Sequence, residues 1–171
     1  MTTASVAESP RRFLTIARSF ASNDPNAKRQ QYITIGFRES VDGGWVEKPK
    51  EKYPHPAMES FHAAFDAIGE YVVKYGGLSA VQSASLVVVS VVFRYAKDGQ
   101  CEVVLNAARP LAGFRQPKLE TIPQHAPEGD ELKAIEDLEA EAVLYIDGKR
   151  GQLDLAVDGD PDDDQMRLDD N

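Results

Sequence analysis

The residues best suited to chemistry lie in the first third of the chain, where basic and aromatic side chains are interleaved. Residues 10–53 contain nine Lys or Arg residues against five Asp or Glu residues, with Tyr32, Trp45 and Tyr53 among them. Cations neutralise phosphates, and aromatic rings stack on unpaired bases. This combination indicates a surface that binds single-stranded nucleic acid.

Within this segment, residues 31–39 alternate apolar and polar side chains, as a strand with one buried face does. The face opposite the core would carry Tyr32 for base stacking, Gly36 for close approach and Arg38 for a phosphate. The predicted nucleic-acid-binding residues are Arg18, Lys28, Arg29, Tyr32, Arg38, Trp45, Lys48 and Lys50.

Motifs for catalysis or for a bound cofactor are missing. The sequence has no P-loop, no G-x-G-x-x-G and no G-x-S-x-G. Its three histidines form no zinc-binding motif, and Cys101, the single cysteine, is best explained as a small core residue. We therefore expect a protein that is not an enzyme, with no catalytic residue, no metal and no cofactor.

Charge is divided unevenly along the chain. Residues 1–127 contain 15 basic and 12 acidic side chains, whereas residues 128–171 contain 4 and 16. The net charge of −9 thus combines a mildly basic body with a strongly acidic C-terminal part, an asymmetry that bears on the choice of partners. Almost nothing apolar follows Val157, so residues 158–171 are predicted to form a disordered acidic tail.

Two partner hypotheses follow from this division of charge. In the first, the tail competes with nucleic acid for the basic surface. That plan is similar to the plan of single-stranded-DNA-binding proteins with a barrel body, although residues 167–171 lack a terminal aromatic residue. In the second, residues 128–171 mimic a phosphate backbone and bind a basic protein, as acidic inhibitors of the DNA-mimic, anti-defence or immunity type do.

The elements that must position these residues are those of an α+β protein. An apolar stripe from Met58 to Tyr75 predicts a helix that Gly76 and Gly77 end. A second, acidic helix is expected from Asp130, as N-cap, to about Ile146, with Leu132 on its apolar stripe. Strands are expected at 13–20 (with Leu14 and Ile16 on one face), 31–39, 45–46, 86–95 and 101–106, and a short one at 119–122.

The order βββαββ, followed by the acidic helix, fits either an open antiparallel sheet or an OB-like barrel. Residues 48–56 contain three prolines and are expected to be an irregular connection. The domain plan is a flexible N-terminus over 1–10, one α+β domain over 11–157 and the tail, with no internal repeat. The longest apolar run is too short to span a bilayer and no signal peptide is visible, so we expect a cytoplasmic protein without a membrane partner.

Overall fold

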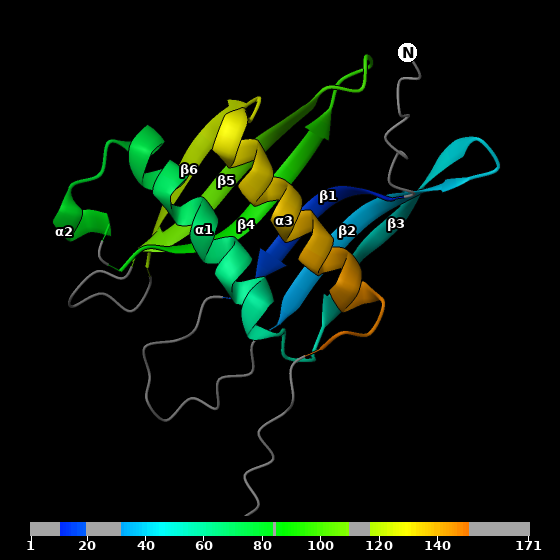
Figure 1. Cartoon of the computed structure of the whole chain (residues 1–171), viewed down its shortest axis with the longest axis horizontal. Helices are drawn as coiled ribbons and strands as arrows, with labels where there is room; N and C mark the ends of the chain where they lie inside the picture. The colour runs from blue at the N-terminus through cyan, green and yellow to red at the C-terminus, as the bar shows by residue number, and fades with distance from the viewer. Residues whose placement is uncertain (1–10, 20–31, 84, 110–116, 151–171) are drawn as a thin grey trace, which may run out of the picture.

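The structure is a computed structural model, and it describes residues 11–19, 32–83, 85–109 and 117–150 (Figure 1). The predicted termini and the predicted site residues Lys28 and Arg29 lie outside these ranges. The described elements are β1 (Arg11–Arg18), β2 (Ile33–Val41), β3 (Gly44–Tyr53), α1 (Glu59–Gly76), α2 (Ala80–Ser83), β4 (Val87–Tyr95), β5 (Cys101–Arg109), β6 (Lys118–His125) and α3 (Gly129–Ile146).

All six strands join one antiparallel sheet in the order β3-β2-β1-β4-β5-β6. The edge strands β3 and β6 lie at opposite ends of this order, so the sheet is open. The α+β class and the open antiparallel sheet are confirmed, and the OB-like barrel does not form.

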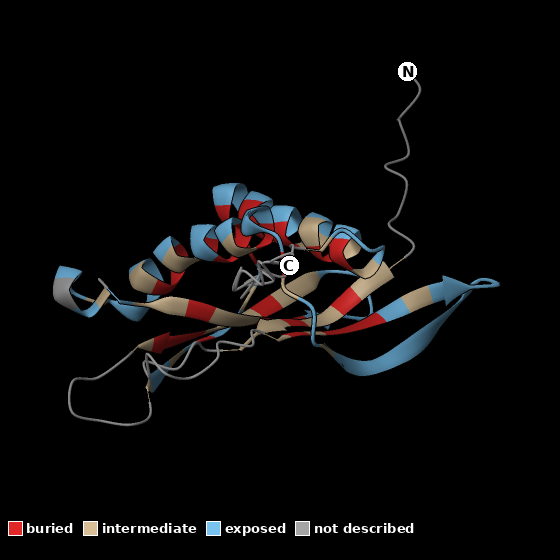
Figure 2. Ribbon diagram, turned by 90° about the horizontal axis from the view of Figure 1, so that it is seen from below, coloured by how far each residue is buried: buried red, intermediate tan, exposed pale blue. Residues whose placement is uncertain are grey.

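The two long helices cover one face of the sheet (Figure 2). Helix α1 packs on β4, β5 and β6, and α3 packs on α1 and β1. Figure 2 places both helices on the same side of the sheet, and no described helix covers the other side. The core is therefore one-sided, and we call the uncovered surface of the sheet the open face.

Helix α1 confirms its prediction from apolar spacing. Phe61, Phe65, Ile68 and Val72 are buried against the sheet, because residues three and four apart share one side of a helix. Gly77 ends the helix in the left-handed conformation, with φ of 60°, which glycine adopts without steric cost. Helix α3 also forms where expected, but its cap is Glu128 rather than Asp130.

Three details of the strands differ from expectation. A β-bulge between Phe13 and Thr15 inserts Leu14 as an extra residue, so Phe13 and Ile16, rather than Leu14 and Ile16, share the buried face. Strand β3 runs through Pro49 because an edge strand tolerates a residue without an N–H group. The β-branched residues on both faces of β4 predict burial on both sides, but the strand is buried only on its helix side, so that prediction is wrong.

The structure also contains an internal repeat that the sequence did not reveal. The chain forms two βββα units, β1-β2-β3-α1 and β4-β5-β6-α3, which meet at the β1–β4 pair. From either edge of the sheet inward, the strands are the third, second and first of a unit, as a twofold relation between the units requires.

The helices of the two units correspond residue by residue. Each has 18 residues, and α3 starts 70 positions after α1. Five buried positions of α1 recur as buried positions of α3 at this offset; they are Phe61, Ala64, Phe65, Ile68 and Val72, which match Glu131, Ala134, Ile135, Leu138 and Ala142. Residue types differ at most of these positions, so a comparison of letters alone does not show the repeat.

The strands and the ring contacts obey the same correspondence. The bulge after Phe13 in β1 recurs after Val88 in β4. At the end of β3, Tyr53 packs edge-on against Tyr145 of α3, with 5.6 Å between ring centroids. At the end of β6, His125 packs on Tyr75 of α1 at 4.9 Å. Each helix is thus held by a ring from the other unit, and the two units form one core.

Replacing Phe65 with Ala tests this core, because Phe65 is fully buried between α1 and the sheet. The variant should lose about 3–5 kcal/mol of unfolding free energy, measured by urea denaturation. The matched control is Leu144→Ala on α3, where the side chain is 42% exposed and a loss of no more than about 1 kcal/mol is expected. Equal losses in the two variants would contradict the one-sided core.

Candidate nucleic-acid interface

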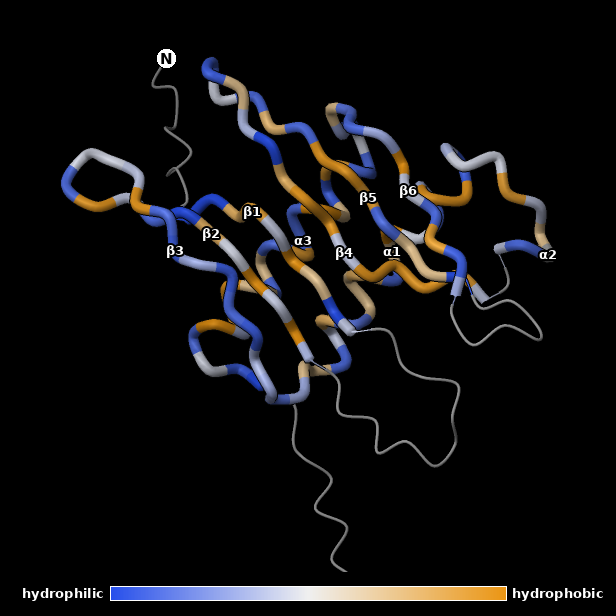
Figure 3. The backbone as a smooth tube through the Cα atoms, turned by 180° about the vertical axis from the view of Figure 1, so that it is seen from behind, coloured by the Kyte–Doolittle hydropathy of each residue, from blue (hydrophilic) through white to orange (hydrophobic). Residues whose placement is uncertain are grey.

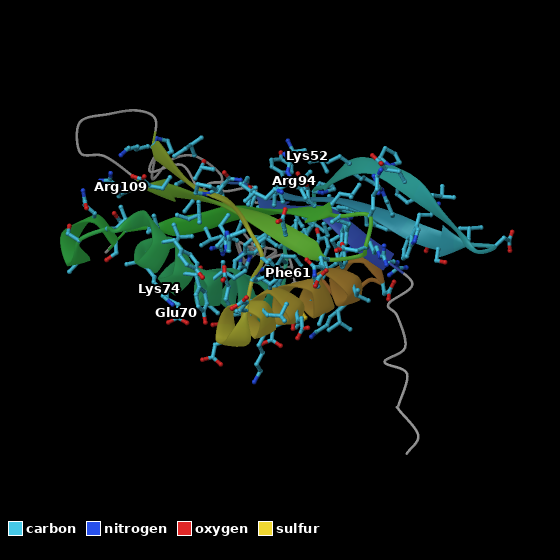
Figure 4. All side chains as sticks on the ribbon, turned by 90° about the horizontal axis from the view of Figure 1, so that it is seen from above. Lys52, Phe61, Glu70, Lys74, Arg94 and Arg109 are labelled. Carbon is cyan, nitrogen blue, oxygen red and sulfur yellow. The ribbon has the colours of Figure 1, made fainter. Side chains whose placement is uncertain are left out.

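Charge is separated between the two layers of the fold. Helices α1 and α3 carry nine Asp or Glu residues and two Lys residues. The six strands carry ten Lys or Arg residues and five Glu residues. Figure 4 shows Lys52 and Arg94 on the side of the sheet away from the helices, and Glu70 and Lys74 on the helix layer. The sheet is therefore the basic layer and the helices are the acidic layer.

Strand β2 places its polar side chains on the open face. Ile33, Ile35 and Phe37 are buried beneath the helices. Successive side chains of a strand point to opposite faces, so Thr34, Gly36 and Arg38 lie on the open face, together with Tyr32 just before the strand. Figure 3 looks onto this face, and the colour of the backbone tube along β2 alternates between hydrophobic and more hydrophilic residues.

Strand β3 brings two lysines next to these residues. Lys52 pairs with Thr34 in the ladder, and its Nζ atom lies 3.8 Å from the centroid of the Tyr32 ring. The stem of Lys50 runs beside Gly36, whose missing side chain leaves it room; Lys50 Cγ is 3.8 Å from the point that a β-carbon of Gly36 would occupy. An aromatic ring and an ammonium group thus meet on neighbouring strands, with the stem of Lys50 alongside them.

A second cation–ring group lies at the end of the sheet where β1 begins. The guanidinium of Arg12 is 4.4 Å from the ring centroid of Trp45 on β3 and 5.4 Å from that of Tyr95 on β4. Trp45 is 38% exposed. Arg94 adds a cation on the open face of β4, next to buried Phe93. The basic surface therefore spans four neighbouring strands.

One exposed ion pair lies within this surface. Arg38 Nη2 is 3.4 Å from the Glu47 carboxylate, and both side chains are largely exposed. Exposed pairs of this kind contribute little and exchange readily, so Arg38 can turn to another anion at small cost.

Two of the predicted site residues lie away from the open face. Arg18 points to the helix side, where its guanidinium pairs with Asp66 at 2.6 Å and its side chain is only 8% exposed. Lys48 lies opposite buried Phe37 in the ladder and is within 3.7 Å of the Glu39 carboxylate. Tyr32, Arg38, Trp45 and Lys50 lie along the open face of β2 and β3, and their role in binding stays a prediction.

Sequence reasoning did not single out Lys52 and Arg94 as members of this surface. Lys52 was assigned to an irregular connection because of the prolines around it, although the alternation of Lys50 and Lys52 with Glu51 was a signal for an edge strand. Arg94 follows a continuous apolar run, where no polar partner in the sequence marks the exposed face. Only the pairing of strands shows that these residues belong to one surface.

A cluster of polar groups lies between α1, α3 and β6, around one buried carboxylate. Glu131 is 2% exposed; its carboxylate accepts a hydrogen bond from the Tyr75 hydroxyl at 2.8 Å and lies 2.6 Å from His125 Nε2. His125 Nδ1 is 2.8 Å from the carbonyl of Pro123, which can only accept, so Nδ1 carries a proton. Glu131 takes the buried position equivalent to Phe61, and Leu132, which was predicted on the apolar stripe, is exposed.

This cluster resembles a catalytic arrangement, but the repeat explains it as packing. The contact of Tyr75 with His125 and Glu131 corresponds to the contact of Tyr145 with Tyr53 and Phe61 in the other unit. In the second contact Tyr145 packs on the ring of Phe61, whereas in the first Tyr75 and His125 make hydrogen bonds to Glu131 at the equivalent position. We therefore assign the cluster to the joining of α1, α3 and β6.

His125 should make stability depend on pH. Burial lowers its pKa, but hydrogen bonds to Glu131 and to the Pro123 carbonyl, together with the Glu131 charge, raise it further, so the net pKa lies above the ordinary value of about 6.5. A raised folded-state pKa stabilises the protein fully below that ordinary value, and the stabilisation is lost as pH rises through the folded pKa. The difference in unfolding free energy between the wild type and His125→Gln should therefore shrink from pH 6 to pH 9, as measured by urea denaturation. A difference that grows with pH would contradict the ion pair.

The described part of the chain contains no group of three or more His, Cys, Asp or Glu side chains that could hold a metal ion. None of its helices is long and apolar enough to cross a membrane. No family model, no curated protein and no solved structure matches the chain.

Proposed function

We propose that the protein binds single-stranded nucleic acid on the open face of its sheet and that it acts without catalysis. The observation that carries this proposal is the meeting of cations and aromatic rings on an uncovered face. Lys52 lies on Tyr32, Arg12 lies on Trp45, and Arg94 stands on the neighbouring strand. The open face would bind the strand through phosphate contacts and base stacking.

The chemistry divides between two kinds of group. Ammonium and guanidinium groups neutralise phosphates, and this contribution is independent of sequence and weakens with salt. Tyr32 and Trp45 offer rings to bases, which are accessible in a single strand and are stacked inside a duplex. The proposed ligand is therefore a single strand, and the proposed binding residues are Arg38, Lys50, Lys52 and Arg94 together with the two aromatic residues.

The acidic layer supports one direction of approach. A polyanion is repelled by the carboxylates of α1 and α3 and attracted by the strands, so it would meet the molecule from the sheet side. We propose that residues 158–171 act as a tethered competitor for the same basic surface in a cytoplasmic protein. A short flexible linker gives such a segment a local concentration in the millimolar range, on the order of what weak contacts need.

Trp45 is the only tryptophan of the chain and provides a built-in reporter. Adding an oligo-dT or oligo-U strand at low salt should quench its fluorescence, and the affinity should fall steeply as salt rises. Lys52→Ala should reduce the salt slope by about 0.7, the value expected for one lost phosphate contact on a single strand. The matched control is Lys74→Ala, which removes the same charge from the helix layer and should leave the slope unchanged. Loss of equal size in both variants would place binding elsewhere.

Tyr32→Ala should weaken binding by about 1–3 kcal/mol if a base stacks on the ring. The fold should be preserved, because the contacts of Tyr32 with Ser19 run through its backbone N–H and carbonyl groups. Anisotropy of a labelled oligonucleotide measures the loss without using Trp45. Unchanged affinity in Tyr32→Ala would remove stacking at this position from the account.

A second candidate function rests on the acidic layer itself. Apart from the buried Glu131, the two helices carry eight carboxylates against two lysines, and a basic protein could bind this surface as it binds a phosphate backbone. Removing residues 158–171 takes away seven carboxylates and one Arg, which changes the net charge from −9 to −3. This truncation should tighten nucleic-acid binding at low salt under the first proposal. Under the second it should weaken capture of a basic protein and leave nucleic-acid binding absent.

A further inference from the structure

A pocket lies between α3 and the sheet, beside the start of β1 and the turn that joins β4 to β5. Its volume is about 280 Å³, and a second pocket of about 250 Å³ adjoins it along α3. Glu136 and Glu139 line both pockets. Phe93, Tyr95 and Ile135 supply aromatic and aliphatic walls.

The corresponding place in the first unit is filled by the side chain of Arg18. Its Nε donates to the Val88 carbonyl at 2.8 Å, its Nη2 lies 2.6 Å from Asp66, and its guanidinium lies 4.7 Å from the centre of the Phe65 ring. Its Nη1 is 3.2 Å from His62 Nδ1. A guanidinium group is thus held between a carboxylate, an aromatic ring and a strand carbonyl.

The residues that hold this guanidinium have direct counterparts in the second unit. At the offset of 70 that relates α1 to α3, Phe65 matches Ile135 and Asp66 matches Glu136. The bulges that relate β1 to β4 place Phe93 at the position of Arg18. The second unit therefore keeps the carboxylate and the apolar wall of the site but has no guanidinium of its own at this position.

Helix α3 adds a second carboxyl group where α1 has none. Glu139 stands at the position of Gly69, on the side of the helix that faces the sheet. Neither Glu136 nor Glu139 makes a hydrogen bond or an ion pair with another described residue. Burial, followed by the negative charge of Glu136, raises the pKa of Glu139 to about 7, as happens to a carboxyl group without a cationic partner.

We propose that the pocket beneath α3 binds the guanidinium group of a ligand, in the place where the first unit binds its own Arg18. Glu136 would pair with the group as Asp66 does, and Glu139 would provide a second acceptor. Bidentate pairing with a carboxylate is the geometry that a guanidinium group favours and an ammonium group does not match.

The two arginines at the start of β1 line the same pocket, and each already has partners. Arg11 pairs with Asp147 at 3.0 Å and lies within 3.7 Å of Glu39. Arg12 lies over the ring of Trp45 and 5.4 Å from the ring centroid of Tyr95, on the sheet side of the pocket. The acidic side of the pocket belongs to α3, so a cation would enter with its charge towards that helix and its apolar part towards Phe93.

Calorimetry or chemical-shift titration with butylguanidine tests the proposal, and butylurea is its neutral isostere. Butylguanidine should bind with a dissociation constant below about 10 mM, and butylurea should show no binding. Glu139→Gln and Glu136→Gln should each weaken binding at least about tenfold, the scale of one lost charge-assisted hydrogen bond. Asp137→Asn, on the exposed side of the same helix, is the matched control and should leave the affinity unchanged.

N-acetyl-arginine amide separates two sources of the group. Binding as tight as that of butylguanidine indicates a guanidinium presented by an arginine of a polypeptide, and binding of butylguanidine alone indicates a small free ligand. Equal binding of butylguanidine and butylurea, or no binding of either, overturns the proposal. So does butylguanidine binding that survives both Glu→Gln substitutions, since it would occur outside this pocket.

The first unit offers a check that needs no change in α3. Arg18→Ala should open the equivalent cavity and destabilise the protein, because the Val88 carbonyl loses its hydrogen-bond donor and Phe65 loses the guanidinium packed on its ring. Millimolar butylguanidine should then raise the melting temperature of Arg18→Ala more than butylurea does. Identical shifts with the two compounds would show that this geometry does not recognise a guanidinium group, and the proposal for the second unit would fall with it.

Discussion

The packing of α1 and α3 against a single face of the sheet determines where every other group can lie. Both helices use their apolar stripes on that face, and rings from β3 and β6 fix them from opposite edges. Side chains that alternate with this core are therefore placed on the open face, where Lys52, Arg38 and Arg94 stand. The helices turn their polar sides outward and carry nine of the eighteen Asp and Glu residues that the structure describes. One-sided burial thus produces both the uncovered sheet and the separation of charge.

The internal repeat shows how one scaffold carries two different surfaces. Both units build the same strands, bulges and helix, so their buried positions correspond closely. Their other positions differ in residue type. For example, Arg38 on the open face of β2 has no basic counterpart on the open face of β5, the equivalent strand. The two units also differ on the helix side of the sheet. Arg18 fills a site in the first unit, whereas two carboxyl groups line the corresponding pocket in the second. The first unit thus bears most of the proposed nucleic-acid surface, to which the second adds Arg94, and the second bears the proposed guanidinium site.

The sequence predicted the parts of this structure that depend on local periodicity. The stripe of α1, the glycine stop at Gly77 and the alternation of β2 all follow from spacing within one element. It failed where tertiary pairing decides, as at Pro49, which an edge strand accepts and a central strand would not. The burial of Glu131 depends on partners from β6 and α1, so no local pattern gives it. Lys52 and Arg94 join one surface only through the β3-β2-β1-β4 order, and the repeat emerges only when burial, not residue type, is compared.

The central claim is that the open face, and not the helix layer, meets the ligand. Backbone amide chemical shifts of the labelled full chain, recorded while a short oligo-dT strand is added at low salt, test it most directly. The account predicts that shifts concentrate on open-face residues of β1, β2, β3 and β4, including Thr34, Lys52 and Arg94, and that they reverse when salt is raised. Shifts confined to α1 and α3, or no shifts at all in low-salt buffer, would contradict it.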